Sequence, residues 1–281
     1  MPCTMKRRLT ILSILFLHFL TLNAQTFPNY IAHGGGAGGE ISWMIYSNSR
    51  EAIMQSIRNG YTFIEIDMVV TSDGHLVAAH DWESFNNVTG HSELGDSAIT
   101  LESFKSSLIY GELTPISIDE VVEILQQHPS VFLVTDKISD VEILDKSLSG
   151  IRNRVYVEAF SIEDFTLLRE AGYHPMYSHP ATNLTEEIIE NLLNGKTRID
   201  FIANSTTDNF KEISRIRCLM PIKIAMYTSN SLDFFDEHLG TDVDLIYTDY
   251  YNPMPGINPL ACSKSCSDFI LLSSVVFIYT A

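Results

Sequence analysis

The chain has 281 residues, 45% of them hydrophobic, with 15 Phe and 12 Tyr. This composition excludes a disordered chain, and the length suits one α/β domain, since single α/β barrels run near ~250 residues. The 35 acidic residues outnumber the 18 Lys and Arg, for a net charge of −17, which excludes charge-driven binding to nucleic acid or to an anionic membrane.

Residues 1–24 have the layout of a secretory signal peptide. The basic stretch Lys6–Arg8 precedes the apolar stretch Leu9–Leu22, and Ala24 offers a small residue at the cleavage point. The alternative is an uncleaved anchor helix, but the apolar stretch is short for a membrane span, which needs ~20 residues. We therefore expect an exported protein, periplasmic or extracellular, with no stable membrane span after cleavage.

Strand-like and helix-like segments alternate through the rest of the chain. Helix starts are expected at Asn48, with Glu51 completing a capping box, and at Ser117, with Glu120 doing the same. Nine segments have the apolar content or alternation of strands. These segments are 29–33, 62–69, 75–80, 131–136, 154–160, 174–179, 200–204, 222–228 and 244–249.

The second and third strand segments must form an antiparallel hairpin. The link between them is too short for the crossover that parallel neighbours need, which takes roughly a dozen residues. Pairing Thr71 with Gly74 across the turn places Glu65 opposite His80. Without the return strand, eight parallel strands remain, and eight is the number that closes a (β/α)8 barrel.

The barrel is expected to span residues 25–256, with a polar and irregular insertion at about 81–116. The apolar segment 257–281 is too short to cross a bilayer, and either a packed terminal element or a disordered tail would account for it.

Ionisable side chains collect where the predicted strands end, which is where the site of such a barrel lies. Alternating carboxylates on one strand face suit a hard cation such as Ca²⁺ or Mg²⁺, and two histidines beside it suit acid–base catalysis. A solvated strand face would explain the carboxylates without a metal. The residues concerned are His33, Glu65, Asp67, His80, Asp136 and Glu158.

The glycines Gly34–Gly36 allow two interpretations: a flexible loop, or a close approach of backbone N–H groups to an anion.

Several ordered motifs over residues 29–254 resemble those of the glycerophosphodiester phosphodiesterase family. The resemblance implies a phospholipase-C-like barrel with a small insertion after His80 and Asp81. It also implies cleavage of a small-molecule glycerophosphodiester to an alcohol and glycerol phosphate. The motifs are Ile31–Gly35, Asn48–Ser49, Glu65–Asp67, Thr71–Gly74, Ala79–Asp81, Pro115–Glu120, Tyr227–Asn230 and Ile246–Tyr250.

The resemblance also implies roles for individual residues. His33 and His80 would be the acid–base pair, and Glu65, Asp67 and Asp136 would hold a divalent metal, Ca²⁺ or Mg²⁺. Substrate contacts are expected from Gly34, Gly35, Lys137 and Glu158.

Three positions depart from the family pattern. Gly34 replaces the usual phosphate-binding Arg, and Ser47 replaces a Glu. Asp136 is followed directly by Lys137, where the family has Glu with Lys two residues on, so the two side chains would point apart unless the strand ends there. Two other functions stay open: a metal-independent phosphatidylinositol-type phospholipase C, and a non-catalytic phosphodiester-binding barrel.

Overall fold

A computed structural model describes residues 29–37, 44–188, 201–206, 209–219, 222–241 and 243–249. The expected signal segment 1–24 and the tail 257–281 lie outside these residues. No helix within them is long and apolar enough to cross a membrane.

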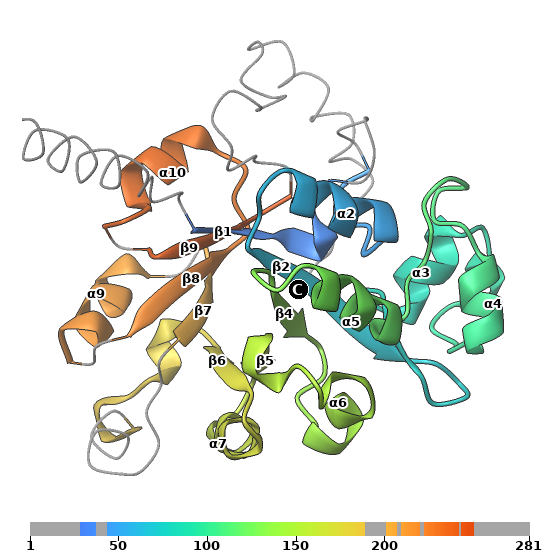
Figure 1. The fold of residues 1–281 in the computed structure, drawn as a ribbon. Helices are drawn as coiled ribbons and strands as arrows, with labels where there is room; N and C mark the ends of the chain where they lie inside the picture. The colour runs from blue at the N-terminus through green and yellow to red at the C-terminus, as the bar shows by residue number, and fades with distance from the viewer. Residues whose placement is uncertain are drawn as a thin grey trace, which may run out of the picture.

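Eight parallel strands form a closed ring with helices outside it, so the expected (β/α)8 barrel is confirmed (Figure 1). The ring runs β1-β9-β8-β7-β6-β5-β4-β2 and closes through pairing of β1 with β2. All of its strands coincide with segments predicted from the sequence. They are β1 (Asn29–Ala32), β2 (Phe63–Val70), β4 (Phe132–Asp136), β5 (Val155–Ala159), β6 (His174–Ser178), β7 (Phe201–Ser205), β8 (Lys223–Tyr227) and β9 (Leu245–Thr248).

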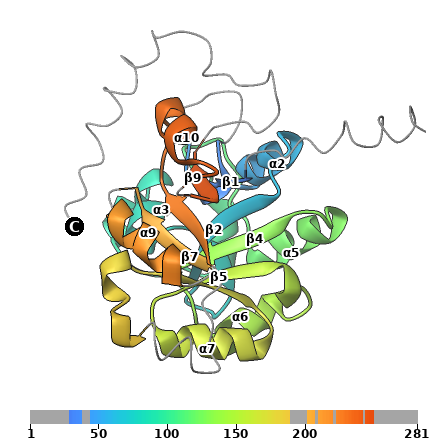
Figure 2. The same cartoon turned by 90° about the vertical axis from the view of Figure 1, so that its left-hand side faces the viewer.

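Most of the outer helices begin at a side-chain cap. Ser117 and Glu120 form the expected capping box of α5. The expected cap at Asn48 is wrong, because Ser49 accepts the hydrogen bond from Ala52 N at 3.2 Å and caps α2. Around the ring lie α2 (Arg50–Arg58), α5 (Ile118–Gln127), α6 (Val141–Leu148), α7 (Ile162–Ala171), α9 (Phe210–Leu219) and α10 (Leu232–His238), with short 3-10 turns η1 (His33–Gly35), η3 (Arg152–Arg154) and η4 (Ala181–Asn183) (Figure 2).

The strands bury apolar residues on both faces. Ile64, Ile66 and Met68 of β2 pack outward with the helices in the main core. The inward face carries a second, smaller cluster that fills the barrel, and β2 contributes Phe63 to it. Because strand residues alternate, Glu65 and Asp67 follow Phe63 on the inward face, beyond the point where the apolar filling ends.

The antiparallel hairpin is confirmed, but its expected register is wrong by one residue. β3 (Leu76–Ala78) pairs Ala78 with Met68. The backbone N–H of Thr71 donates to His75 O at 2.9 Å, so three residues form the loop. Gly74, at φ +88°, supplies the left-handed position that such a loop needs. A two-residue loop, as expected from the sequence, would shift the pairing by one residue.

The insertion after β3 is more ordered than expected. It contains α3 (Trp82–Val88), the 3-10 turn η2 (Ser92–Leu94) and α4 (Leu101–Ser106), beside β2 and β3 in Figure 1. Phe85 and Phe104 stack with ring centroids 4.5 Å apart, at the centre of a separate apolar cluster. The polar surface of this segment concealed two short amphipathic helices. The cluster also contains Met44, Val77, Ala79, Ile109 and Leu113.

Candidate active site

Three carboxylates meet at the C-terminal ends of β2 and β4. The register pairs Asp67 with Asp136, so these side chains come from adjacent strand positions. Glu65 is 2% exposed and Asp67 is fully buried. Burial, followed by the charge of Asp67, raises the pKa of Glu65 well above its ordinary value. Such a group of buried anions is costly unless a cation accompanies it.

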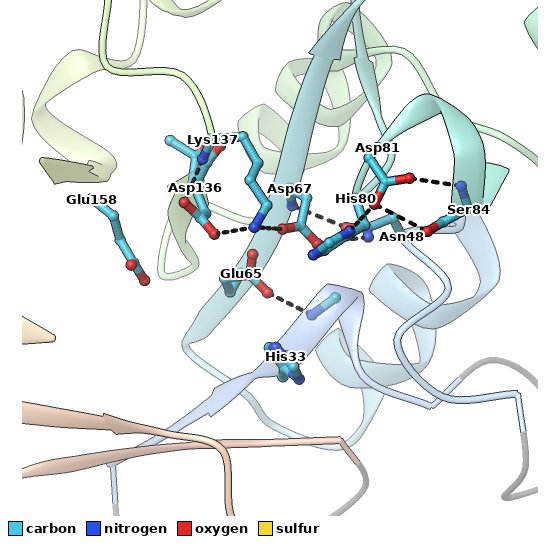
Figure 3. Close-up of polar contacts among 12 residues, drawn as sticks. His33, Asn48, Glu65, Asp67, His80, Asp81, Ser84, Asp136, Lys137 and Glu158 are labelled. Atoms are coloured by element: carbon cyan, nitrogen blue, oxygen red, sulfur yellow. Dashed lines mark hydrogen bonds and ion pairs between the residues drawn. The ribbon is translucent and has the colours of Figure 1, made fainter. Parts of the chain in front are cut away.

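Lys137 supplies one cation to this cluster. β4 ends at Asp136, and Lys137 adopts a positive φ of 71°, which breaks strand alternation and turns both side chains to the same place. Its Nζ atom lies 3.0 Å from Asp136 Oδ2 and 3.8 Å from Asp67 Oδ1, between the two carboxylates (Figure 3). Because the strand ends at Asp136, the adjacent Asp136 and Lys137 side chains can point to the same place despite following one another in sequence.

Asn48 fixes the orientation of Asp67. Its side-chain amide donates to Asp67 Oδ2 at 3.0 Å, and its side-chain oxygen accepts from the backbone N–H of Asp67 at 3.0 Å. The other carboxylate oxygen, Oδ1, is buried and has no hydrogen-bond partner among the described residues. Asp67 is thus held with one oxygen available to a ligand.

These carboxylates fit a hard divalent cation by donor type, since Ca²⁺ and Mg²⁺ prefer oxygen ligands, and the available Asp67 Oδ1 supports that fit. Within the described residues, no three His, Cys, Asp or Glu side chains are already arranged to hold one ion. The Lys137 ammonium lies between two of the three expected ligands.

His33 follows β1 and is held by a residue from the last strand. The register pairs Ala32 with Thr248, so the next residues, His33 and Asp249, meet. His33 Nδ1 lies 2.8 Å from Asp249 Oδ1, and Asn230 donates to the other carboxylate oxygen at 2.6 Å. Because Nδ1 faces this carboxylate, Nε2 is the ring nitrogen left for chemistry, and it lies 3.5 Å from Thr228 Oγ1.

His80 is held by its neighbour in sequence. Its Nδ1 atom contacts Asp81 Oδ2, while Asp81 Oδ1 caps α3 by accepting from Ser84 N at 2.6 Å. Burial raises the pKa of Asp81, but hydrogen bonds from Ser84 and His80 outweigh it and the net pKa is lowered. His80, like His33, therefore presents Nε2.

Tyr46 connects the two histidines. Its ring stacks on His33 with centroids 4.1 Å apart and meets His80 edge-on at 5.5 Å. Burial, followed by the charges of Asp67 and Glu65, raises the pKa of the Tyr46 phenol well above its usual range. The hydroxyl therefore stays protonated beside the carboxylates.

Glu158 lies on β5 beside the acid cluster, and its contacts are with buried groups. The Tyr247 hydroxyl donates to Glu158 Oε1 at 2.5 Å. Burial, with a further contribution from the charge of Asp136, raises the pKa of Glu158 to about 7. At neutral pH this carboxyl is therefore partly protonated, unlike an ordinary glutamate.

The glycine run brings a backbone N–H to an anion, although that anion is part of the protein. Gly34 N donates to Glu65 Oε2 at 2.6 Å. Gly35 accepts a hydrogen bond from the Ser56 hydroxyl at 2.7 Å. This stretch, with positive φ at each of Gly34–Gly36, holds β1 against β2 and α2.

The sequence-derived candidates thus gather at one end of the barrel, and Figure 3 shows them around Glu65 and Asp67. The sequence did not predict a role in this site for three of its residues: Tyr46, Asn48 and Asp249. Asp249 could have been found, because it ends its strand as the other acids do and the last strand must neighbour the first in a closed barrel. No comparable signal marks Tyr46.

Residues 35–239 match the sequence profile described as the glycerophosphoryl diester phosphodiesterase family. Among curated proteins, none matches this chain.

Solved structures share the fold. A glycerophosphodiester phosphodiesterase from Thermotoga maritima is 17% identical, with a TM-score of 0.60 over 79% of this chain and 94% of that one. An Oleispira antarctica phosphodiesterase in complex with the product sn-glycerol-3-phosphate is also 17% identical, with a TM-score of 0.60 over 80% and 94%. A glycerophosphoryl diester phosphodiesterase from Parabacteroides distasonis has 14% identity and a TM-score of 0.61 over 86% and 87%.

Proposed function

Because the chain belongs to the glycerophosphoryl diester phosphodiesterase family, we propose that it hydrolyses glycerophosphodiesters to an alcohol and glycerol phosphate with the help of a divalent cation. One observation carries this proposal. Two imidazoles, each held at Nδ1 by an aspartate, are joined by one aromatic ring beside a buried carboxylate cluster. Phosphodiester hydrolysis needs a base, an acid and a place for positive charge next to the phosphate.

His33 and His80 divide the proton transfers. Asp249 and Asp81 occupy the Nδ1 atoms, so the Nε2 atoms are left to exchange protons. One histidine accepts a proton from the attacking water while the other, protonated, donates to the leaving alkoxide. The aspartates keep both rings in one tautomer and stabilise the imidazolium form when it arises.

Glu65, Asp67 and Asp136 would hold the cation, either Ca²⁺ or Mg²⁺. When bound, the cation supplies positive charge that polarises the phosphoryl group. The hydrogen bond from the Asn48 amide to Asp67 Oδ2 would orient the Asp67 carboxylate for that purpose. The Oδ1 atom of Asp67 accepts no hydrogen bond among the described residues. Lys137, which contacts Asp136, would neutralise charge there and would also contact the substrate.

The position of Lys137 favours a second candidate, the metal-independent phosphodiesterase. Its Nζ atom lies between Asp136 and Asp67, so a protein cation already stands among the acids. In that scheme Lys137 itself would provide the positive charge, and no divalent ion would be needed.

A substrate panel with and without chelator tests both schemes. Release of glycerol phosphate would be measured from glycerophosphocholine, glycerophosphoethanolamine and glycerophosphoinositol. We expect activity to disappear in EDTA, to return with Ca²⁺ or Mg²⁺, and to be lost in Glu65→Gln through weaker coordination. Glu123→Gln, an exposed change on α5, is the matched control and should behave as the wild type.

The outcomes separate the alternatives. Full activity in excess EDTA together with loss of activity in Lys137→Met would replace the metal-dependent scheme with the lysine scheme. Binding of these diesters without turnover under any condition would leave a binding barrel.

Export is part of the proposal. The basic and apolar pattern of residues 1–24 supports cleavage after Ala24 and a periplasmic or extracellular location. N-terminal sequencing of the protein recovered from the culture medium or the periplasm should begin at Gln25. Recovery of the intact N-terminus from the cytoplasmic fraction would contradict export.

A further inference from the structure

Glu158 is an inward-facing acid that neither the proposed proton transfers nor the proposed cation site uses. It lies on β5, two residues after Tyr156, which packs against the apolar cluster inside the barrel. Strand alternation therefore points Glu158 into the barrel as well. The register of β4 against β5 places it beside Asp136, and Figure 3 shows it on the side of Asp136 away from Asp67. Glu158 thus flanks the carboxylate cluster.

Two hydroxyl groups hold the Glu158 carboxylate. Tyr247 belongs to β9, which β8, β7 and β6 separate from β5 around the ring, so its hydrogen bond to Glu158 Oε1 at 2.5 Å crosses the barrel. Ser178, from the neighbouring strand β6, donates a second hydrogen bond. Both partners are neutral, unlike Lys137, which contacts Asp136. The Glu158 carboxylate is therefore oriented without having its charge neutralised by them.

A carboxylate held in this way retains acceptor capacity. Its oxygens offer about four acceptor sites, and the hydroxyls of Tyr247 and Ser178 occupy only part of them. Glu158 is 5% exposed and Tyr247 is 1% exposed, so the carboxylate, rather than the phenol, retains surface that a ligand can touch. The remaining acceptor sites suit a vicinal diol, because a diol presents O–H donors on adjacent carbon atoms.

The cation of the proposed function is compatible with this arrangement. Glu65, Asp67 and Asp136 would hold it, which leaves Glu158 outside its ligands. Burial, followed by the charge of Asp136, raises the pKa of Glu158, so positive charge beside Asp136 favours the ionised form of Glu158. An ionised carboxylate accepts hydrogen bonds and donates none. It therefore binds substrate hydroxyls and repels phosphate oxygens, which belong near the cation.

Resting on the proposed function, we propose that Glu158 is a substrate-binding residue that recognises the two hydroxyl groups of the glycerol moiety. Tyr247 and Ser178 are positioning residues that hold its carboxylate toward this diol. The phosphate then lies toward Glu65 and His33, and the diol lies toward β5. This arrangement makes the protein select glycerophosphodiesters over phosphodiesters whose corresponding arm has no hydroxyl groups.

A pair of substrates that differ only in these hydroxyl groups tests the selection. Glycerophosphocholine carries them and propyl phosphocholine does not. The wild type should favour glycerophosphocholine about a hundredfold in kcat/KM, since each hydrogen bond to a charged group contributes about tenfold. Glu158→Gln should narrow this preference about tenfold, through a higher KM for glycerophosphocholine, because the amide loses the charge and one acceptor oxygen. The KM for propyl phosphocholine should stay at the wild-type value.

Two further variants separate recognition from damage to the fold. Ser178→Ala removes one bond that holds Glu158 and should narrow the preference less, about threefold. Asp145→Asn is the matched control, because Asp145 also accepts from a tyrosine, Tyr173, at 2.8 Å, but lies on the outer helix α6. Asp145→Asn should keep the wild-type preference.

A second comparison identifies which arm of the diester carries the recognised hydroxyl groups. Glu158→Gln should raise the KM by the same factor for glycerophosphocholine and glycerophosphoinositol, which share the glycerol moiety. A loss confined to glycerophosphoinositol would assign Glu158 to the alcohol and overturn the proposal. An unchanged preference in Glu158→Gln would overturn it too, as would equal losses for glycerophosphocholine and propyl phosphocholine.

The proposed function fails separately, if the wild type turns over no phosphodiester. Binding then decides the role of Glu158. Calorimetry should show that the wild type binds sn-glycerol 3-phosphate at least about tenfold more tightly than propyl phosphate, and that Glu158→Gln reduces this difference. Equal affinities of the wild type for the two phosphates, or no binding of either, would count against the inference.

Discussion

The two histidines are held by aspartates in contrasting ways. His33 pairs with Asp249, 216 residues away in sequence, and the two side chains are 21% and 10% exposed. His80 pairs with the adjacent Asp81, and those side chains are 37% and 40% exposed. The first pair exists only when the barrel closes, whereas the second needs only the start of α3.

The His33 pair therefore depends on the fold of the whole barrel, whereas the His80 pair depends on local structure. The His33 pair depends on the register of β1 against β9, and Asn230 bonds both the carboxylate and the backbone of Asp249. The His80 pair depends on a helix cap, in which Asp81 accepts from Ser84. We therefore expect the His33 side to be the more rigid and the more sensitive to substitution.

Removing either imidazole should have the largest effect. His33→Ala and His80→Ala should each lower kcat by about 10²–10⁴, the usual contribution of general acid–base catalysis. Affinity for glycerophosphocholine should change far less. Steady-state kinetics across pH would show each variant losing one limb of a bell-shaped profile. His91→Ala, at an exposed position in the insertion, is the control. A variant that retains both limbs would remove that histidine from the mechanism.

Neutralising the aspartates should produce a smaller and unequal effect. Asp249→Asn replaces the acceptor at Nδ1 in a buried setting, so we expect kcat to fall by about 10–100-fold, as for other partners that orient a functional histidine. Asp81→Asn should cost less than tenfold, because its site is exposed and Asn also caps helices well. Asp140→Asn, at the cap of α6, is the matched control for the helix effect. Equal losses at both positions would contradict the contrast drawn between the two pairs.

The pH dependence of the free energy of unfolding should differ in sign between the surroundings of His33 and those of His80. Tyr247 packs edge-on to His33 at 6.3 Å and bonds Glu158, whose pKa is raised by burial to about 7. A raised carboxyl pKa gives stability that is complete below the ordinary glutamate value and is lost as pH rises through about 7. The lowered pKa of Asp81 gives stability that is lost only as pH falls below the ordinary aspartate value.

Thermal unfolding in chelator would measure this effect. Glu158→Gln should flatten the decline in stability between pH 5 and 8, by about 3 kcal/mol at most for a shift of this size. Some decline should remain, because the pKa of Glu65 is also raised. Glu123→Gln should retain the wild-type slope. Identical slopes in Glu158→Gln and wild type would show that Glu158 does not titrate in this range.

The barrel could be predicted from the sequence because each of its strands is marked by a local pattern. Each strand carries its own apolar pattern, and the short turn after β2 excludes a parallel partner. The register failed at the same turn, because whether Gly74 closes a two-residue or a three-residue loop depends on backbone geometry that the letters do not state. Asn48 and Ser49 both suit a helix cap, and only the position of Asp67 decides between them.

The candidate site was predictable to the extent that strand ends mark it. His33, Glu65, Asp67 and Asp136 all follow from that rule, and Asp249 obeys it as well. Tyr46 does not, because it belongs to the segment before α2 and reaches the site through an unusual backbone conformation. The place of Tyr46 depends on its contacts with Gly34 and His33. These contacts cannot be read from the sequence, because both residues lie well before Tyr46 in the chain and Gly34 has no side chain.

The small apolar cluster of the insertion lies next to two residues of the candidate site, Tyr46 and His80. It includes Met44, two residues before Tyr46, and Ala79, next to His80. Phe85 and Phe104 stack within it, and neither belongs to the main core. A change of volume in this cluster is therefore expected to shift Tyr46 and His80 together, whereas Glu65, Asp67 and Asp136 belong to strands of the barrel. The insertion thus couples two residues of the site that lie far apart in sequence, Tyr46 and His80, through one packed cluster.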